Sequence, residues 1–277
     1  MDYFHELTQT VNRALDEDIR TGDVTASLID PEKKAHAKII TRQPAVICGR
    51  PWVDEVLRQV DATMTPQWHI KDGDQVQTGA LLLELTGKAR SLLTAERTAL
   101  NFLQLLSGTA TRTNTYVQMI EGTGATLLDT RKTIPGLRLA QKYAVKTGGA
   151  ENHRIGLFDA FLIKENHIEA AGSITAAIET ARQLQGDLRV EVEVENLEQL
   201  GEAIMATPDW IMLDNFTLGD MRKAVDIASN TGIKLEASGG IETSTELKKI
   251  ASTGVDYISI GALTKHTEAI DLSMRLL

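Results

Sequence analysis

Residues 189–261 read RVEVEVENLEQLGEAIMATPDWIMLDNFTLGDMRKAVDIASNTGIKLEASGGIETSTELKKIASTGVDYISIG. Short strand-like runs alternate in this stretch with longer stretches that have helical spacing. The strand-like runs are RVEVEV, WIMLD, IKLEAS and DYISIG, and they recur about every 20 to 30 residues. Regular alternation of strand and helix predicts a parallel sheet whose crossovers are helices.

Two further strand-like runs lie upstream, ATLLD at 125–129 and DAFLIK at 159–164. Six or more such units close naturally into an α/β barrel of the TIM type. Each run ends in a polar residue or a glycine. These residues are Asp129, Lys164, Glu193, Asp214, Ser238 and Gly261. Because the carboxyl ends of barrel strands form the active-site face, the six residues predict a functional site there.

The N-terminal part has a mixed α and β pattern. Helical spacing is found over 3–18, 51–60 and 91–116, with strand-like runs between them. Gly108 interrupts the long helical pattern and predicts a bend or break in it. We therefore predict an N-terminal domain over 1–108 and a barrel domain over 109–265. The tail 266–277 is expected to pack back on the first domain.

The composition is that of a globular protein with an acidic balance. The 277 residues are 42% hydrophobic and 24% charged, and the net charge of −9 argues against wholesale nucleic-acid binding. Cys48 is the one cysteine, so no disulfide can form within the chain, which fits a reducing compartment. The acidic N-terminus does not resemble a signal peptide, and no apolar run approaches a membrane span. We expect a cytoplasmic protein.

The segment 130–167 is basic against this acidic background. Seven cations and three carboxylates give it a net charge of +4, which leaves the rest of the chain at −13. Arg138, Lys142 and Lys146 have helical spacing and are expected on a solvated helix face. The other four cations are Arg131, Lys132, Arg154 and Lys164. They adjoin strand-like runs or glycines, and their concentration there predicts a pocket for a polyanionic small molecule.

Two glycine-bearing loops follow the last two strand-like runs, and each precedes a helix. The first contains Ser238, Gly239 and Gly240, and the second Ile260, Gly261 and Ala262. Small residues let backbone N–H groups approach an anion, and a helix N-terminus favours negative charge. Because TIM barrels often hold phosphate at their last two loops, we predict a phosphate site here.

Glu193 and Asp214 are expected on the same face as these loops. Carboxylates beside a phosphate can hold a bridging metal, accept hydrogen bonds from ribose hydroxyls or stabilise a developing cation. All three uses indicate a sugar phosphate or pyrophosphate as the ligand. Glu191 and Glu195 have the same strand parity as Glu193, so periodicity leaves open which of them reach the site.

The stretch 129–168, DTRKTIPGLRLAQKYAVKTGGAENHRIGLFDAFLIKENHI, resembles the signature region of the quinolinate phosphoribosyltransferase family. Later segments resemble that family in the same order, namely VEVEVENLEQL, IMLDNF, LEASGGI and GVDYISIGALTK. The earlier helix ERTALNFLQLLSGTAT is similar as well. The resemblance extends over essentially the whole chain.

This resemblance implies a type II phosphoribosyltransferase with an N-terminal α/β sandwich and an open or incomplete α/β barrel. The implied reaction joins quinolinate to phosphoribosyl pyrophosphate and yields nicotinate mononucleotide, pyrophosphate and carbon dioxide in NAD biosynthesis. Mg²⁺ is expected on the diphosphate. The resemblance also implies a homodimer or higher homo-oligomer, in which Arg97 reaches the active site of the neighbouring subunit.

Individual roles follow from the same resemblance. The residues implied to clamp the two quinolinate carboxylates are Arg131, His153, Arg154 and, from the neighbouring subunit, Arg97. Lys132 and Lys164 are implied between those carboxylates and the phosphoribosyl donor. Glu193 and Asp214 should face the ribose hydroxyls and the metal. The residues that should hold the phosphate are Ser238, Gly239, Gly240, Ile260, Gly261 and Ala262.

Two alternatives remain open at this point. A related type II phosphoribosyltransferase would act on another carboxylated ring, and the number of ring carboxylates would distinguish it. A non-enzymatic anion-binding homologue would bind without turnover. The carboxylates at 193 and 214 favour an enzyme.

Overall fold

The computed structural model describes residues 2–240 and 244–277. The chain forms two compact units. The first takes in the chain up to Asn114 together with Thr133–Gly149 and Leu263–Leu277, and the second takes in Thr115–Lys132 and Ala150–Ala262. Each unit gathers separate stretches of chain, and the single boundary between residues 108 and 109 stays a prediction.

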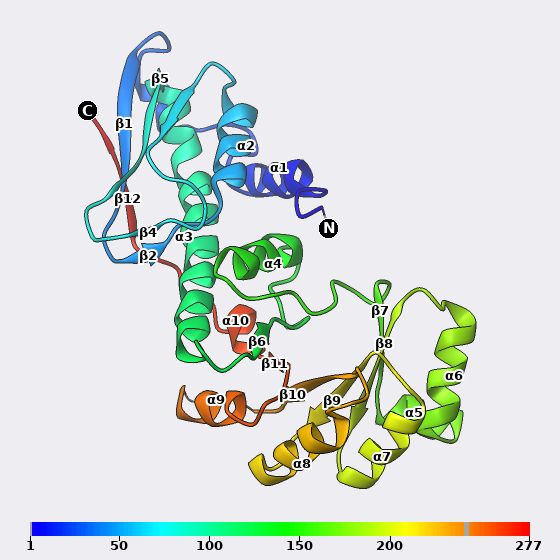
Figure 1. Cartoon of the computed structure of the whole chain (residues 1–277). Coiled ribbons are helices and arrows are strands. Elements are labelled where there is room, and N and C mark those ends of the chain that lie inside the picture. The colour runs from blue at the N-terminus through cyan, green and yellow to red at the C-terminus, as the bar shows by residue number, and fades with distance from the viewer. Residues whose placement is uncertain (1, 241–243) are drawn as a thin grey trace. The chain divides into compact units, whose positions relative to one another are not determined.

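An antiparallel sheet in the order β12-β1-β5-β3 forms the centre of the first unit (Figure 1). The strands are β1 (Lys34–Thr41), β3 (Thr65–Trp68), β5 (Leu81–Lys88) and β12 (Leu272–Leu276), beside a separate pair of β2 (Ala45–Val46) and β4 (Gln75–Val76). Strand β12, from the C-terminal end of the chain, pairs with β1 so that Leu276 lies opposite Ala37.

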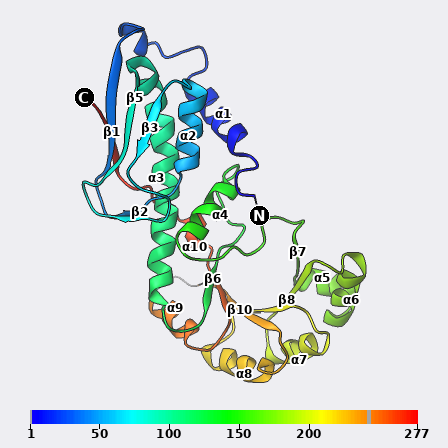
Figure 2. The same ribbon diagram turned by 45° about the horizontal axis from the view of Figure 1, so that its top comes forward.

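Helices complete the first unit (Figure 2). They are α1 (Leu7–Asp18), a 3-10 turn at Ala26–Leu28, α2 (Arg50–Val60), α3 (Ala89–Met119), α4 (Arg138–Thr147) and α10 (Ala262–Lys265), of which α3 and α10 extend into the second unit. Trp52 of α2 packs with Leu83 of β5 and Leu103 of α3 in one buried core. This burial of helix and sheet faces against each other confirms the α/β class of the N-terminal part.

Helix α3 runs unbroken through Gly108, so the predicted bend or break there was wrong. The glycine has a packing reason instead. A Cβ at this position would overlap the Glu268 carbonyl oxygen, because the backbone before β12 crosses α3 at that point. A glycine inside a helix costs about 1 kcal/mol relative to alanine. The close approach of the two backbones accounts for its presence.

A parallel sheet of six strands forms the second unit, in the order β6-β11-β10-β9-β8-β7. The strands are β6 (Thr126–Leu128), β7 (Ala160–Ile163), β8 (Arg189–Val194), β9 (Trp210–Asp214), β10 (Lys234–Ser238) and β11 (Tyr257–Ser259). Among the described residues, no ladder joins β6 to β7. The sheet is therefore open, which confirms the predicted incomplete barrel.

Helices α5 (Glu165–Ala171), α6 (Ile174–Leu184), α7 (Leu197–Met205), α8 (Leu218–Ala228) and α9 (Ser244–Ala251) join the strands (Figure 1). Polar N-caps fix where several of them begin. The side chains of Ser173, Asn196 and Thr217 accept backbone N–H groups of the first turns of α6, α7 and α8. Because Asn196 and Thr217 cap the helices that follow β8 and β9, the loops after these two strands stay short.

Strand β8 shows how the sheet divides its two faces. Val190, Val192 and Val194 are fully buried, as expected for residues that pack beneath the crossover helices. Alternate residues Arg189, Glu191 and Glu193 point to the opposite face, which is the inside of the barrel. This face is charged, whereas the inside of a closed TIM barrel is mainly filled by branched apolar side chains.

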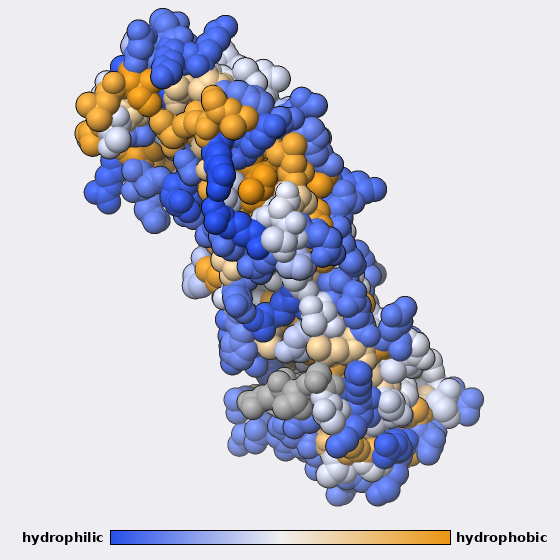
Figure 3. Space-filling model, turned by 90° about the vertical axis from the view of Figure 1, so that its left-hand side faces the viewer, coloured by the Kyte–Doolittle hydropathy of each residue, from blue (hydrophilic) through white to orange (hydrophobic). Residues whose placement is uncertain are grey.

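The first unit carries a hydrophobic patch. Figure 3 shows hydrophobic residues gathered over the part of this unit where Figure 1 places β1, β5 and β12. Leu276 and Leu277 at the end of the chain are exposed. Apolar surface of this kind is available to a binding partner. Within the part of the chain that the structure describes, no helix is long and apolar enough to span a bilayer.

The packing at Gly108 predicts an unequal response of two helical glycines to alanine. In Gly108→Ala the new methyl group must displace the backbone at Glu268, so we expect a loss of about 1–3 kcal/mol in the free energy of unfolding. Gly201→Ala on α7 meets open space and should gain about 0.5–1 kcal/mol. Urea unfolding of both variants measures the difference. Equal effects would contradict the close approach.

Candidate active site

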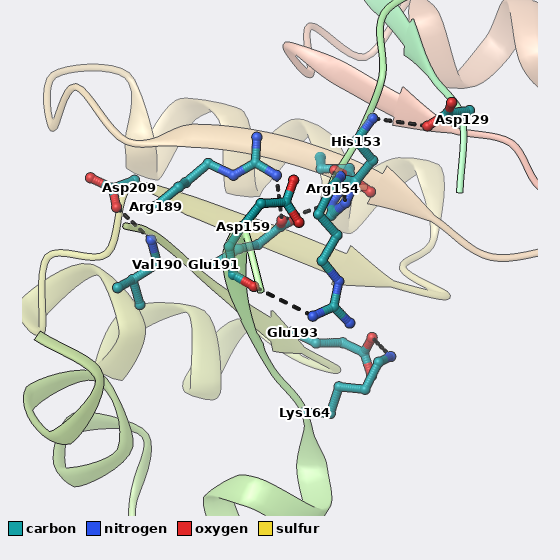
Figure 4. Close-up of polar contacts among 12 residues, drawn as sticks. Asp129, His153, Arg154, Asp159, Lys164, Arg189, Val190, Glu191, Glu193 and Asp209 are labelled. Atoms are coloured by element: carbon teal, nitrogen blue, oxygen red, sulfur yellow. Dashed lines mark hydrogen bonds and ion pairs between the residues drawn. The ribbon is translucent and has the colours of Figure 1, made fainter. Parts of the chain in front are cut away.

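The carboxyl ends of the parallel strands bring four predicted residues to one edge of the sheet. Lys164 directly follows β7, Glu193 is in β8, and Asp214 and Ser238 end β9 and β10. The Lys164 ammonium forms an ion pair with the Glu193 carboxylate (Figure 4). The predicted strand-end face therefore exists, with a cation and an acid already in contact on it.

Lys132 reaches the same edge from the loop after β6. A Cβ added to Gly261 would lie 3.0 Å from Lys132 Cδ and 3.8 Å from its Nζ, so the lysine side chain passes over this glycine. The Ile260 N–H donates to the Leu128 carbonyl oxygen at 2.9 Å and is engaged in the sheet. Gly261 and the start of α10 at Ala262 thus lie beside the Lys132 ammonium.

The loop after β10 depends on a residue that sequence reasoning did not single out, Asn215. Its backbone is left-handed at φ +55°, its N–H donates to Ser238 O at 3.1 Å, and its side-chain amide donates to Asp214 Oδ2 at 3.1 Å. Gly239 has φ +127°, and a Cβ there would lie 2.5 Å from Asn215 Oδ1. The pattern of polar strand ends could not reveal this contact, because it depends on the backbone conformation of two loops.

A cavity of about 390 Å³ opens beside these loops. Its lining includes Ser238, Gly239 and Gly240 from one loop, Asn215 from the other, and Lys249 of α9. The cavity lies between the loops after β9 and β10, so it includes the first of the two predicted phosphate loops but not Ile260, Gly261 or Ala262, and the phosphate site stays a prediction. Lys249 adds a cation to the small residues that the sequence indicated.

Asp129, which is fully buried and directly follows β6, binds the part of the basic segment 130–167 that contains Arg154. Asp129 Oδ1 accepts the His153 N–H at 3.0 Å (Figure 4), and Oδ2 accepts the Asn152 side-chain amide at 2.8 Å. Asp159 similarly accepts the N–H groups of Ile155 and Gly156 at 2.8 and 3.0 Å. Two carboxylates thereby fix the backbone on both sides of Arg154.

Arg131 and Arg154 approach each other in this basic segment. Burial and, next, the charge of Arg131 lower the pKa of the Arg154 guanidinium from its ordinary value. Arg131 Nε is buried without a hydrogen-bond partner among the described residues. Two guanidinium groups that repel each other and keep an unused buried donor are suited to an anion that binds between them.

His153 lies behind Arg154 and faces into the barrel (Figure 4). Its Nε2 is 2.8 Å from Glu191 Oε2 and 3.2 Å from Glu236 Oε2, and both carboxylates are fully buried. Its Nδ1 accepts the Arg154 N–H at 2.7 Å. Both ring nitrogens therefore contact the protein itself, and the role of His153 as a direct ligand for a carboxylate stays a prediction.

A stack of side chains from the first residues of three strands lies next to these acids. The Arg189 guanidinium lies 4.0 Å from the centre of the Trp210 ring, and Trp210 stacks on Tyr257 at 4.1 Å and 13°. Arg189 Nη2 is 3.9 Å from Glu191 Oε2. The sequence did not predict Arg189 and Glu236 as site residues, because the predicted functional face consisted of the carboxyl ends of the strands.

The helix cations do not all behave as expected. Arg138, Lys142 and Lys146 were predicted on a solvated face, but Lys142 is fully buried in α4, so the prediction was wrong for this residue. Neighbouring Gln141 and Ala144 are buried as well, so the buried face of α4 includes the position of Lys142. Arg97 lies on α3 in the first unit, and its side chain is exposed.

Comparison with known proteins identifies the family. The model of the quinolinate phosphoribosyl transferase C-terminal domain matches residues 109–275, and that of the N-terminal domain matches residues 23–107. The chain belongs to the quinolinate phosphoribosyltransferase family.

Individual relatives are similar over nearly their whole length. A probable nicotinate-nucleotide pyrophosphorylase (carboxylating) of Bacillus subtilis is 42% identical over 97% of this chain and 93% of its own. The nicotinate-nucleotide pyrophosphorylase (carboxylating) of Mycobacterium leprae is 42% identical over 99% and 98%. The solved structure of the nicotinate-nucleotide pyrophosphorylase from Francisella tularensis has a TM-score of 0.95 and 51% identity, covering 98% of this chain and 96% of that one.

The acids around His153 predict a pH-dependent stability. Burial disfavours the charged ring, but the adjacent Glu191 and Glu236 outweigh burial and raise the pKa of His153 from 6.5 to about 9. Because the pKa of the folded state is the higher one, the stabilisation is fully present below pH 6.5 and is lost as the pH rises to about 9. We expect a fall of ~3 kcal/mol at most in the free energy of unfolding.

Urea unfolding between pH 6 and pH 9.5 measures this fall in the wild-type protein. His153→Gln, which cannot take up the proton, serves as the comparison and should lack the fall across that window. If the free energy of unfolding fell equally with pH in both proteins, the fall would not come from His153.

Proposed function

We propose that the chain transfers the phosphoribosyl group of phosphoribosyl pyrophosphate to quinolinate. The products are nicotinate mononucleotide, pyrophosphate and carbon dioxide, in the synthesis of NAD. Family membership over the whole chain supports this activity. The observation that supports it most within the site is the pair Arg131 and Arg154, with the unused buried Nε of Arg131. A ligand with two ring carboxylates matches a pair of guanidinium groups.

The chain's own side chains suit the first step, attack of the pyridine nitrogen on the anomeric carbon. Arg131 and Arg154 would hold the ring through its carboxylates and so orient the nitrogen. Lys132 and Lys164 would lie between that ring and the pyrophosphate that leaves. Glu193 and Asp214 would stabilise the positive charge that develops on the sugar as the bond to pyrophosphate breaks. Much of the rate would come from positioning and charge neutralisation.

Decarboxylation would follow in the same place. Ribosylation makes the ring nitrogen cationic, and this cation stabilises the carbanion that remains when the neighbouring carboxylate leaves as carbon dioxide. The arginines that bind the substrate carboxylates keep the ring oriented during this step. A proton must then reach the carbanion, and Lys132 and Lys164 carry ammonium groups at the same edge of the sheet.

Glu193 and Asp214 fit a magnesium ion that accompanies the diphosphate. Mg²⁺ prefers oxygen ligands and is usually bound by one or two carboxylates together with waters and substrate phosphates. Glu193 already has the Lys164 ammonium as a neighbour, and Asp214 is oriented by the Asn215 amide. When bound, the ion would neutralise the leaving pyrophosphate, while the two carboxylates and the lysines orient the donor.

A homodimer or higher homo-oligomer with shared active sites is part of the proposal. Arg97 is exposed on α3, and the adjacent residues Thr98 and Asn101 line a cavity of about 380 Å³ in the first unit. The same cavity is also lined by Arg13, Glu17 and Asp18. The exposed guanidinium of Arg97 would suit the acidic substrates of a second copy. The hydrophobic patch over the first unit provides apolar surface for association (Figure 3). A cytoplasmic location also stays a prediction.

The substrate is tested by comparing quinolinate with nicotinate, which has a single carboxylate. We expect pyrophosphate and carbon dioxide in equal amounts with quinolinate, and little turnover with nicotinate. Arg154→Ala should lower kcat/KM for quinolinate at least about a hundredfold, or ~2.7 kcal/mol, because it removes half of the guanidinium pair. Arg222→Ala, which removes an exposed arginine of α8, should leave it unchanged. A preference for nicotinate without carbon dioxide release would refute the proposed reaction.

Shared sites predict complementation between two inactive variants. Arg97→Ala damages the residue donated to the neighbour, and Lys164→Ala damages the residue at the strand end, so each homo-oligomer should be nearly inactive. In mixed oligomers some sites contain neither change, and activity should partly return. Activity after mixing under conditions that exchange subunits is the measurement, with exchange verified by differently tagged chains. No recovery in verified mixed oligomers would rule out sharing.

A further inference from the structure

His153, Glu191 and Glu236 form a closed cluster inside the barrel, behind the strand-end site. They come from the loop before β7, from β8 and from β10. Both carboxylates are fully buried, and the His153 side chain is 6% exposed. The ligand atoms of the three residues lie within 4.8 Å of one another. The three side chains are thus shielded from solvent, and His153 directly precedes Arg154 in the chain (Figure 4).

The contacts of this cluster are few. Nε2 of His153 is near one oxygen of each carboxylate, at 2.8 and 3.2 Å, and Arg189 Nη2 approaches Glu191 at 3.9 Å. Apart from these ion-pair contacts, the oxygens of Glu191 and Glu236 have no hydrogen-bond partner among the described residues. On the other side of the ring, Nδ1 accepts the backbone N–H of Arg154. His153 therefore joins the two acids to the arginine that follows it.

Burial of two such acids needs a reason. Removing a carboxylate from water costs several kcal/mol in proteins, and apolar residues of similar size often stabilise a fold as well or better. Each buried carboxylate here depends on the imidazole, and the imidazole in turn accepts the Arg154 N–H. The cluster is therefore costly for packing alone, whereas it is well placed to fix the position of Arg154.

We propose that Glu191 and Glu236 are positioning residues of the substrate clamp, which hold His153 and, through the N–H that His153 accepts, Arg154. They would also supply the negative charge that offsets the repulsion between Arg154 and Arg131. This role rests on the proposed function for the identity of the substrate. It assigns substrate contact to Arg154 and gives His153 the part of a link between the acids and the arginine.

The protons in the cluster agree with this arrangement. Burial lowers the pKa of His153, but the two acids outweigh burial and raise this pKa to about 9. Nδ1 accepts the Arg154 N–H, so in the neutral ring the proton is on Nε2, which faces the acids. The charged groups around the ring are Glu191, Glu236, Arg189, Arg154 and, on the backbone side, Asp129.

The test uses Glu191→Gln, Glu236→Gln and the double variant in the full chain. Amide side chains keep the shape but remove the charge. We expect KM for quinolinate to rise at least about tenfold, with KM for phosphoribosyl pyrophosphate changed by less than about twofold. Glu198→Gln, which changes an exposed glutamate of α7, should alter neither value. Equal damage to both substrates would indicate a purely structural role and would overturn the proposal.

A second measurement does not depend on turnover. Nitrogen NMR of the His153 ring in the wild-type protein should show titration near pH 9 and, above that pH, a ring with Nε2 protonated and Nδ1 unprotonated. A ring that titrates near 6.5 would overturn the positioning role even if a glutamine variant failed to fold. Bound metal that is lost in the glutamine variants would overturn it too, because the acids would then be ligands.

The two proposals fail in distinguishable ways. A wild-type protein that does not turn over quinolinate would refute the proposed reaction, and the ring titration of His153 would remain as measured. Normal turnover of quinolinate by the wild type, together with unchanged KM in both glutamine variants, would refute the positioning role alone.

Discussion

Repulsion between the guanidinium groups of Arg131 and Arg154 is the constraint on which the rest of this site depends. Each cation disfavours the other, and both are partly withdrawn from water. The protein opposes that repulsion with buried carboxylates. Asp129 and Asp159 fix the backbone beside Arg154 without occupying its guanidinium through their own oxygens. The guanidinium groups of Arg131 and Arg154 thus stay available to a substrate anion. The carboxylates that offset their repulsion lie on the protein side of the pair.

The open barrel makes this arrangement possible. Parallel strands bring Lys164, Glu193 and Asp214 to one edge, and the capped helices after β8 and β9 begin close to that edge. Two glutamates of β8 point to the inside of the barrel. Glu193 lies at the strand-end edge beside Lys164, and Glu191 lies deeper in the barrel and contacts His153. A barrel filled by apolar side chains would offer no counter-charge for the basic loop. The buried carboxylates inside the barrel therefore lower the stability of the fold relative to an apolar interior, but they supply the charge that the basic loop requires.

Much of this could be predicted from the sequence, because alternating strand and helix patterns give a parallel sheet and polar strand ends mark its edge. Periodicity could not decide between Glu191 and Glu193, since both have the same parity. Asn215 and Glu236 escaped prediction because their roles depend on contacts between different strands and loops. Gly108 was misinterpreted as a helix break, because the backbone that crosses it comes from residues far along the chain.

The central claim is that paired guanidinium groups recognise a dicarboxylate at the strand ends. A crystal structure of the protein with quinolinate bound tests it most directly. The account predicts the two carboxylates of quinolinate within hydrogen-bond distance of Arg131 and Arg154, with His153 still turned toward Glu191 and Glu236. Quinolinate bound away from both arginines, or His153 rotated out of its acid pair to contact the ligand, would contradict it.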